Sequence, residues 1–245
     1  MKRIILFLLI IFVAGLLYFF LTKTTETQDV LQESSKHEPL AVSYDSIDYH
    51  IYYTDITDHD IVLVPNFDAQ LSGNTLIQNN NCTAGINGGF YTQEDKPLGL
   101  FKTNNILIEK EKEVTNLVTG FFSVDRSGYF HISSTYDNSY PTILQTGPLM
   151  YNINTLSIKN DKPARRQAIV QTTNNDFYIV AVTIQGQATS GPLLSDLPTI
   201  LFSVTEPFTV KTAINLDGGS ASYYRGDDGT ELAELTYIGS LLCVK

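Results

Sequence analysis

The chain opens with one long apolar segment and continues as a series of short apolar runs. Residues 4–21 carry no charged or strongly polar side chain. At about 1.5 Å per helical residue, a segment of this length nearly crosses a bilayer core of about 30 Å. Lys2 and Arg3 precede it, so the positive-inside rule keeps this end in the cytoplasm. We therefore expect a signal anchor (transmembrane helix) over residues 1–21, with a cleaved signal peptide and a buried core helix as alternatives.

Beyond the apolar segment, the runs are short and have the character of strands. They are rich in Ile, Val, Thr, Tyr and Phe, and each is bounded by Gly, Asn, Asp, Pro or Thr, as strands are. The dipeptides Asn104-Asn105 and Asn174-Asn175 predict hairpin turns. The predicted strands cover residues 49–54, 61–64, 98–103, 106–109, 117–124, 128–133, 142–145, 167–172, 176–184, 210–216 and 238–244.

Helix signals are few. Ser195, followed by an apolar stripe with a proline in its first turn, predicts a helix with Ser195 as N-cap, and residues 68–80 are a second candidate. Residues 22–40 are polar and without periodicity, which indicates a linker. We therefore predict an α+β fold: a single domain over residues 41–245, rich in antiparallel or mixed β-sheet with few helices, behind an N-terminal transmembrane helix.

Composition narrows the possible functions. The hydrophobic fraction of 43% is sufficient for a globular core. The net charge is −10 and no run of Lys or Arg occurs, so we expect no nucleic-acid partner. None of the four His residues lies at zinc-ligand spacing from another, which argues against a His-rich metallohydrolase. We expect no metal and no cofactor, with a calcium ion at Asp227 and Asp228 as the alternative.

Cys82 and Cys243 are the only cysteines. The predicted topology places the domain outside the cytoplasm, on the periplasmic or cell-surface side, or secreted if the signal is cleaved. Such a compartment permits a disulfide between the two residues. Two buried free thiols are an equal alternative, because Cys also packs well as a small apolar residue.

Four segments depart from ordinary strand and turn patterns. They are INGGFY (86–91), QTGPLM (145–150), ARRQAIV (164–170) and AINLDGGSAS (213–222). The paired glycines let the backbone approach a ligand closely, and an arginine offers a planar fork for phosphate. In the last segment, Asp217 comes at the end of an apolar strand. A strand holds a carboxylate at this position rigidly, while the loop that follows stays open to a ligand. Taken singly, each segment also fits a turn, a loop or a surface ion pair.

Taken together and in this order, the four segments resemble the phosphodiester glycosidase family over about residues 49–245. The resemblance implies hydrolysis of the bond between a sugar's anomeric carbon and a phosphodiester. It implies a glycophosphate or polysaccharide substrate. The implied catalytic residues are Asp217, Arg166 and Asn87, and the implied substrate-binding residues are Gly88, Gly89, Phe90, Gln145, Thr146, Gly147, Asn215, Gly218, Gly219 and Ser220.

The chemistry of these residues is consistent with that reaction. Breaking a glycosyl–phosphate bond develops an oxocarbenium-like sugar, which requires a carboxylate as general base or nucleophile. Asp217 is the residue we expect to supply it. The departing phosphate requires neutralisation more than protonation. Arg166 and the backbone N–H groups of Gly218 and Gly219 would provide this by electrostatic stabilisation.

Other residues of the four segments would hold the sugar. Asn87 and Gln145 carry amides that can bind sugar hydroxyls or an acetamido group. The Phe90 and Tyr91 rings would offer a flat face to the sugar. Glu94 and Asp95 follow closely, but we expect both in a solvated loop, so neither is assigned as a second carboxylate. The stereochemical outcome of the reaction is therefore not assigned either.

Two alternatives to an active enzyme remain. Val170 stands where the family usually has Gly, and the last motif continues as Ser220-Ala221-Ser222 where a third Gly is common. These departures would fit a catalytically inactive glycophosphate- or carbohydrate-binding module at the cell surface. A structural envelope protein, in which the motifs only shape turns, is the second alternative. We expect the enzyme, acting on extracytoplasmic glycans or envelope polymers with an N-acetylglucosamine-type sugar.

Overall fold

The computed structural model describes residues 37–112, 117–153 and 156–245. The predicted anchor over residues 1–21 and most of the predicted linker lie outside the described residues. Among the residues described, no helix is long and apolar enough to cross a membrane. The compact unit that carries the sheets runs from Lys36 to Lys245.

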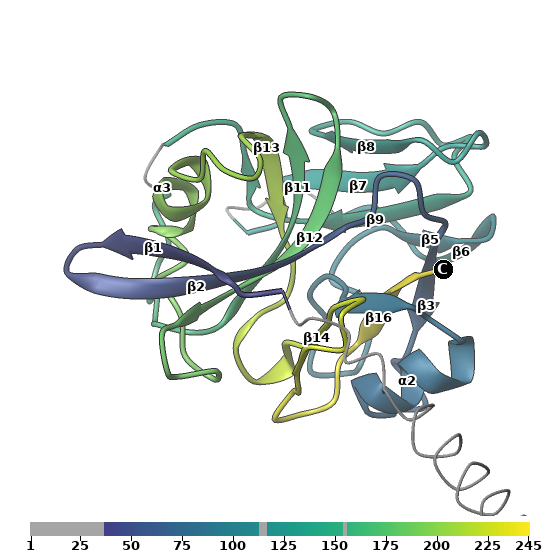
Figure 1. Cartoon of the computed structure of the whole chain (residues 1–245). Helices are drawn as coiled ribbons and strands as arrows, with labels where there is room; N and C mark the ends of the chain where they lie inside the picture. Colours follow the sequence, from purple (N-terminus) through teal and green to yellow (C-terminus); the bar gives the residue numbers. More distant parts are fainter. Residues whose placement is uncertain (1–36, 113–116, 154–155) are drawn as a thin grey trace, which may run out of the picture. The chain divides into compact units, whose positions relative to one another are not determined.

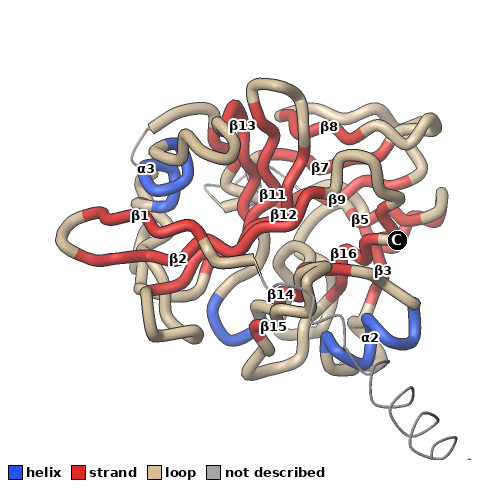
Figure 2. Tube along the Cα trace, viewed as in Figure 1, coloured by secondary structure: helices blue, strands red, loops and turns tan. Residues whose placement is uncertain are grey.

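The described residues form three sheets, and every strand pair within them is antiparallel (Figures 1 and 2). The first sheet has the strand order β1-β2-β12-β11-β13-β10. Its strands are β1 (Leu40–Tyr44), β2 (Ile47–Asp55), β12 (Phe177–Ile184), β11 (Arg166–Thr172), β13 (Val210–Asn215) and β10 (Leu149–Met150).

The second and third sheets have five strands each. The second has the order β15 (Glu231–Leu232), β14 (Tyr224–Arg225), β4 (Ala84–Asn87), β16 (Ser240–Val244) and β3 (Ile61–Pro65). The third has the order β6 (Ile106–Glu109), β5 (Phe101–Thr103), β9 (Thr142–Thr146), β7 (Gly120–Val124) and β8 (Phe130–Ser133).

The helices of the described part are short, as the sequence predicts. Helix α2 (Gly73–Asn80) begins where the Ser72 side chain accepts a hydrogen bond from the N–H of Thr75, at 3.2 Å, and a hydroxyl in this position satisfies one free donor of the first turn. Helix α3 (Leu197–Phe202) is found where expected, but its N-cap is Asp196 rather than Ser195, and no side chain caps it. A single 3₁₀ turn, η1, covers Gly219–Ala221.

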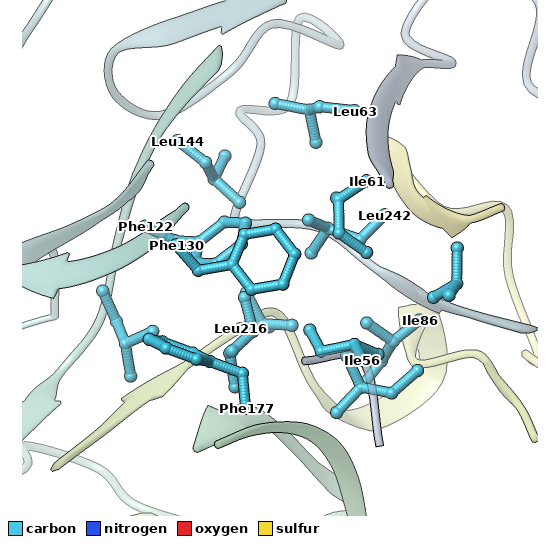
Figure 3. Close-up of a cluster of buried hydrophobic side chains, with 14 of the residues drawn as sticks. Ile56, Ile61, Leu63, Ile86, Phe122, Phe130, Leu144, Phe177, Leu216 and Leu242 are labelled. Carbon is cyan, nitrogen blue, oxygen red and sulfur yellow. The ribbon is translucent and has the colours of Figure 1, made fainter. Parts of the chain in front are cut away.

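Alternation along the strands distributes the apolar side chains over both faces of the first sheet. On β11, Ile169 belongs to a central cluster, whereas Ala168 and Val170 belong to a second cluster beneath α3. All three sheets contribute to the central cluster, so it holds them together (Figure 3). Its labelled members are Ile56, Ile61, Leu63, Ile86, Phe122, Phe130, Leu144, Phe177, Leu216 and Leu242.

A disulfide joins Cys82, just after α2, to Cys243 on β16, with 5.4 Å between the two Cα atoms. Of the two alternatives left open by the sequence, the structure has the bridged form. The bond closes a loop of 161 residues in sequence separation. It therefore ties the end of the helix to β16, an interior strand of the second sheet.

Every run predicted to be a strand contains one, and the β-rich class with few helices is confirmed. Both Asn104 and Asn105 have positive φ, as a tight hairpin turn requires. Two strands lie outside the predicted runs, namely β4 and β1, which begins at Leu40, the last residue of the predicted linker. The two-residue strands β10, β14 and β15 also lie outside them. Two residues are too few for periodicity to be detected.

Candidate active site

The end of β13 and the end of β4 meet at Asp217. The N–H of Asp217 donates to the carbonyl oxygen of Gly88 at 3.0 Å. In return, the Asn87 side-chain amide donates to the carbonyl oxygen of Asp217 at 2.8 Å. Two of the segments singled out in the sequence are thus joined at the backbone of one carboxylate-bearing residue.

The segment around Thr146 packs against the same place. The Thr146 hydroxyl donates to the carbonyl oxygen of Asn215 at 3.0 Å. The Asn215 amide donates to the carbonyl oxygen of Gly147 at 2.9 Å. A Cβ atom at Gly89 would lie 3.2 Å from the Thr146 side chain, so only glycine allows this close approach without displacing Thr146.

The arginine segment completes the arrangement. The N–H of Leu216 donates to Gln167, and that of Gly219 donates to the Arg165 carbonyl oxygen, both at 2.9 Å. Ala168 pairs with Asn215 in the β11–β13 register. Arg166 lies two residues before Ala168, and Asp217 lies two residues after Asn215. Because side chains two residues apart point to the same face of a strand, Arg166 and Asp217 lie on the same face of the sheet. All four segments singled out in the sequence converge here.

The Asp217 carboxyl has the acidity of a proton-transfer group. Burial raises its pKa to about 7, although the N–H of Gly218, which donates to Oδ1 at 2.8 Å, and the charge of Arg166 both act to lower it. The residue nevertheless keeps partial solvent exposure. A carboxyl with a pKa near neutrality can both accept and return a proton at neutral pH.

The Arg166 guanidinium is held on one side and open on the other. Its Nη2 donates to Asp161 Oδ1 at 3.1 Å and to the Lys162 carbonyl oxygen at 2.6 Å, and Nε donates to the Pro192 carbonyl oxygen at 3.0 Å. Nη1 makes no hydrogen bond within the described ranges, and it lies 3.8 Å from where a Cβ of Gly218 would be. Nη1 therefore lies beside the loop that carries Asp217.

Asp161 is a residue that sequence reasoning missed. Its carboxylate accepts hydrogen bonds from the backbone N–H groups of Leu194 at 3.0 Å and Ser195 at 2.8 Å, besides pairing with Arg166. Burial alone would raise the pKa of Asp161, but these N–H donors and the arginine lower it below its ordinary value. Asp161 sits in the polar stretch Lys159–Lys162, which reads as a solvated loop, so no local pattern marks it.

Arg165, next to Arg166, has a different environment. It is almost fully buried and donates to the Ser222 hydroxyl at 2.6 Å and to the Ala233 carbonyl oxygen at 2.7 Å, with a further hydrogen bond to the Ser222 carbonyl oxygen. Burial lowers its pKa to about 10. The Ser222 hydroxyl also donates to the Gly219 carbonyl oxygen, at 2.6 Å. Arg165 and Ser222 together fix the loop that follows Asp217.

The sequence profile of the phosphodiester glycosidase family matches residues 80–234, a range that contains all four segments. The chain belongs to the phosphodiester glycosidase family. No curated protein matches the chain.

Two solved structures are similar to this chain in fold. A hypothetical protein from Synechocystis has a TM-score of 0.60 at 12% identity, covering 84% of this chain and 61% of that one. The catalytic domain of zebrafish N-acetylglucosamine-1-phosphodiester α-N-acetylglucosaminidase, auto-inhibited by its pro-peptide, has a TM-score of 0.53 at 16% identity. The match covers 89% of this chain and 91% of the zebrafish chain. At these sequence identities, the two comparisons show that the chain shares the fold of these structures.

Two amides of the phosphodiester glycosidase motifs are engaged inside the protein. Both N–H bonds of the Asn87 amide are used, toward Asp217 and Gly88, and its oxygen accepts from the N–H of Tyr223 at 2.9 Å. The Gln145 amide exchanges hydrogen bonds with the backbone of Lys112 at 2.9 and 3.0 Å. These contacts connect both amides to the backbone of neighbouring segments, and the sugar-binding roles expected from the sequence stay predictions.

The expected anion site at the two glycines is also not free. The N–H of Gly218 donates to the Asp217 carboxylate and that of Gly219 to the Arg165 carbonyl oxygen. Ser220, the next residue, is exposed, and its carbonyl oxygen accepts from the N–H groups of Leu235 and Thr236. Both backbone N–H groups are therefore already engaged within the protein.

An aromatic pair lies on the β4 side of the site. The Tyr91 hydroxyl donates to the carbonyl oxygen of Tyr237 at 3.0 Å, and the two ring centroids are 5.4 Å apart. Burial raises the pKa of Tyr91, and the charge of Asp217 adds to the effect. Asp95 accepts hydrogen bonds from the Tyr237 hydroxyl and from Gln70, so it is a bonded residue and not the solvated one expected. Neighbouring Phe90 is half-buried.

Proposed function

We propose that the protein hydrolyses the glycosidic bond of a sugar-1-phosphodiester. The observation that carries this proposal is the position of Asp217 near Arg166, where the charge of each acts on the other, at the same end of two adjacent strands. The carboxyl has a pKa of about 7, and Nη1 of the guanidinium lies beside the loop that carries Asp217. A proton-transfer group beside a fixed cation matches the two demands of this reaction.

In the proposed reaction, ionised Asp217 accepts a proton from a water molecule. The resulting hydroxide attacks the anomeric carbon, and the bond from that carbon to the phosphate oxygen breaks with its electron pair staying on the phosphate. The products are a free sugar and a phosphomonoester. Arg166 stabilises the charge that grows on the leaving oxygen, so the phosphate needs no proton from the protein.

The rest of the site supports the recognition of a sugar. The Tyr91 ring, held by Tyr237, lies on the β4 side of the site, where a flat sugar face can rest against it. By analogy with the substrate in the zebrafish enzyme's name, we propose an N-acetylglucosamine-type sugar. The apolar segment 4–21 and the disulfide favour an extracytoplasmic, membrane-anchored enzyme that acts on envelope glycans.

The departures from the family pattern have structural explanations that leave catalysis open. Val170 is fully buried in the cluster beneath α3, so its side chain fills the core. Ser222 bridges Arg165 and Gly219 and so stabilises the loop after Asp217. Neither departure favours the inactive binding module over the enzyme.

The test is hydrolysis of the methyl ester of N-acetylglucosamine 1-phosphate, with free sugar detected by mass spectrometry. Asp217→Asn is expected to lower turnover by about 10²–10⁴-fold, the usual contribution of a general acid–base group. Asp58→Asn, at an exposed position, is the matched control and should keep full activity. Equal turnover by the parent and the folded Asp217→Asn variant would overturn the proposal.

A further inference from the structure

A second polar depression lies on the outer face of the third sheet, away from the four motif segments. Phe122 and Val124 on β7 point into the central cluster. Ser123, between them, therefore points to the opposite face, together with His131, its partner on β8. The strands concerned, β7 and β8, lie at the upper right of Figure 1. A depression of about 280 Å³ opens over these two side chains, close to the lower end of the about 300–1,000 Å³ of small-molecule sites.

The lining is rich in hydroxyl groups and aromatic rings. Besides Ser123 and His131, it includes Ser133, Thr135, Tyr136 and Tyr140. The rings are held rigidly, since His131 stacks on Tyr140 with centroids 5.1 Å apart and Tyr136 packs on Phe121 at 4.6 Å. Because these rings are already ordered, binding a ligand to them costs little side-chain conformational entropy.

One hydroxyl in this depression is not used inside the protein. Ser123 is only 2% exposed, and its hydroxyl makes no hydrogen bond to any of the described residues. That oxygen is not among the buried polar atoms shut off from solvent, so it opens onto the depression that Ser123 lines. A ligand seated there would replace water as its partner.

The charges at the depression favour a neutral ligand. The His131 ring is paired with Asp125, with 3.1 Å between Nε2 and Oδ2, so it offers no unpaired cation to an anion. The Asp137 carboxylate accepts from the N–H of Ser139 at 2.8 Å, and the Tyr136 hydroxyl donates to Glu111 at 2.9 Å. The other polar groups of the lining are hydroxyls, which can both donate and accept. Alternating hydroxyls and ring faces match the surface of a neutral sugar.

We infer that this depression is a second carbohydrate-binding site, which takes a neutral segment of a polysaccharide. Ser123 pairs with Ile143 on β9, three residues before Thr146 of the catalytic motifs, or about 10 Å along the strand. The site is nevertheless built from different side chains on a different face. Binding there does not require the proposed hydrolysis, and the two can be tested separately.

The experiment uses the full chain in a non-ionic detergent, fluorescently labelled and applied to an array of neutral oligosaccharides. Binding to at least one of them is expected. Ser123→Ala and Tyr140→Phe, which each remove one hydroxyl, should weaken that binding by up to about tenfold. Tyr140→Ala, which also removes the ring, should abolish it. Tyr129→Ala, at a 71% exposed tyrosine outside the depression, is the matched control and should bind normally.

Three results would overturn the inference. They are no binding to the array, binding that survives in all of the Ser123 and Tyr140 variants, and binding that is lost in Asp217→Asn. The last result would place the sugar in the catalytic site instead. Failure of the hydrolysis assay alone, with array binding that depends on Ser123, would refute the proposed function and leave this inference intact.

Discussion

Replacing Asp217 by Asn removes a carboxyl whose ionised form is unfavourable in the folded protein. Asn has nearly the same shape, and its side-chain oxygen can still accept the hydrogen bond that the N–H of Gly218 donates to Asp217 Oδ1 at 2.8 Å. The substitution therefore isolates the effect of the charge. We expect the variant to be inactive and yet more stable than the parent protein.

The size and sign of this effect follow from the raised pKa. Below pH 3.8 the carboxyl is protonated in both the folded and the unfolded protein, so its ionisation does not change the free energy of unfolding. Between pH 3.8 and about 7 the unfolded chain ionises while the folded protein keeps its proton, so the parent's free energy of unfolding falls steadily. Over this pH interval, the parent loses about 4 kcal/mol of its free energy of unfolding, at about 1.36 kcal/mol per pH unit. The advantage of Asp217→Asn should thus be absent near pH 4 and reach a few kcal/mol above pH 7.

The assay is urea unfolding of the domain beginning at Lys36, with the disulfide intact, across about pH 4 to 8. Asp161→Asn is the matched control with the opposite sign, because the pKa of Asp161 is lowered in the folded protein. Its contribution to stability is present above the ordinary pKa and is lost as the pH falls through the folded value. A variant at position 217 that is less stable than the parent above pH 7, or whose advantage does not grow with pH, would refute the reasoning.

Three further predictions concern other parts of the site and fold. Arg166→Lys should lower kcat by about 100-fold, because an ammonium group cannot donate to Asp161 and a phosphate through one planar fork; steady-state kinetics on the folded variant would show it, and unchanged kcat would count against the assigned role. Replacing Cys82 and Cys243 by Ala should lower the free energy of unfolding by about 2–5 kcal/mol, measured by urea unfolding, and an unchanged midpoint would contradict it. Asn87→Ala should cost about 1–3 kcal/mol of stability, since it leaves buried backbone groups without partners; a stable variant with altered KM alone would instead favour direct substrate contact.

Much of the fold could be predicted because it follows from short-range patterns. Alternating β-branched and aromatic runs mark the strands, and paired asparagines mark two hairpin turns, in which Asn104, Asn105 and Asn175 have positive φ. The N-cap of α3 lies one residue after the predicted Ser195. The segment before the helix is held by Asp161, which accepts from the N–H groups of Leu194 and Ser195, and no local pattern predicts this long-range contact.

The site could be predicted only in part. The four motif segments identify which stretches of chain meet, but they do not tell which side-chain atoms remain free. Asn87 and Gln145 carry groups suited to sugars, yet the structure uses those groups to hold the backbone. Asp161 went unnoticed because its importance arises from contacts with Arg166 and Leu194, five and 33 positions away.

The central claim is that the bond between the anomeric carbon and the phosphate oxygen is broken by water. Hydrolysis of the methyl ester of N-acetylglucosamine 1-phosphate in ¹⁸O-labelled water tests it directly, with mass spectrometry of both products. We expect the label in the free sugar and unlabelled methyl phosphate, because the hydroxide formed at Asp217 attacks carbon. Label in the phosphate would show attack at phosphorus, and would contradict the account.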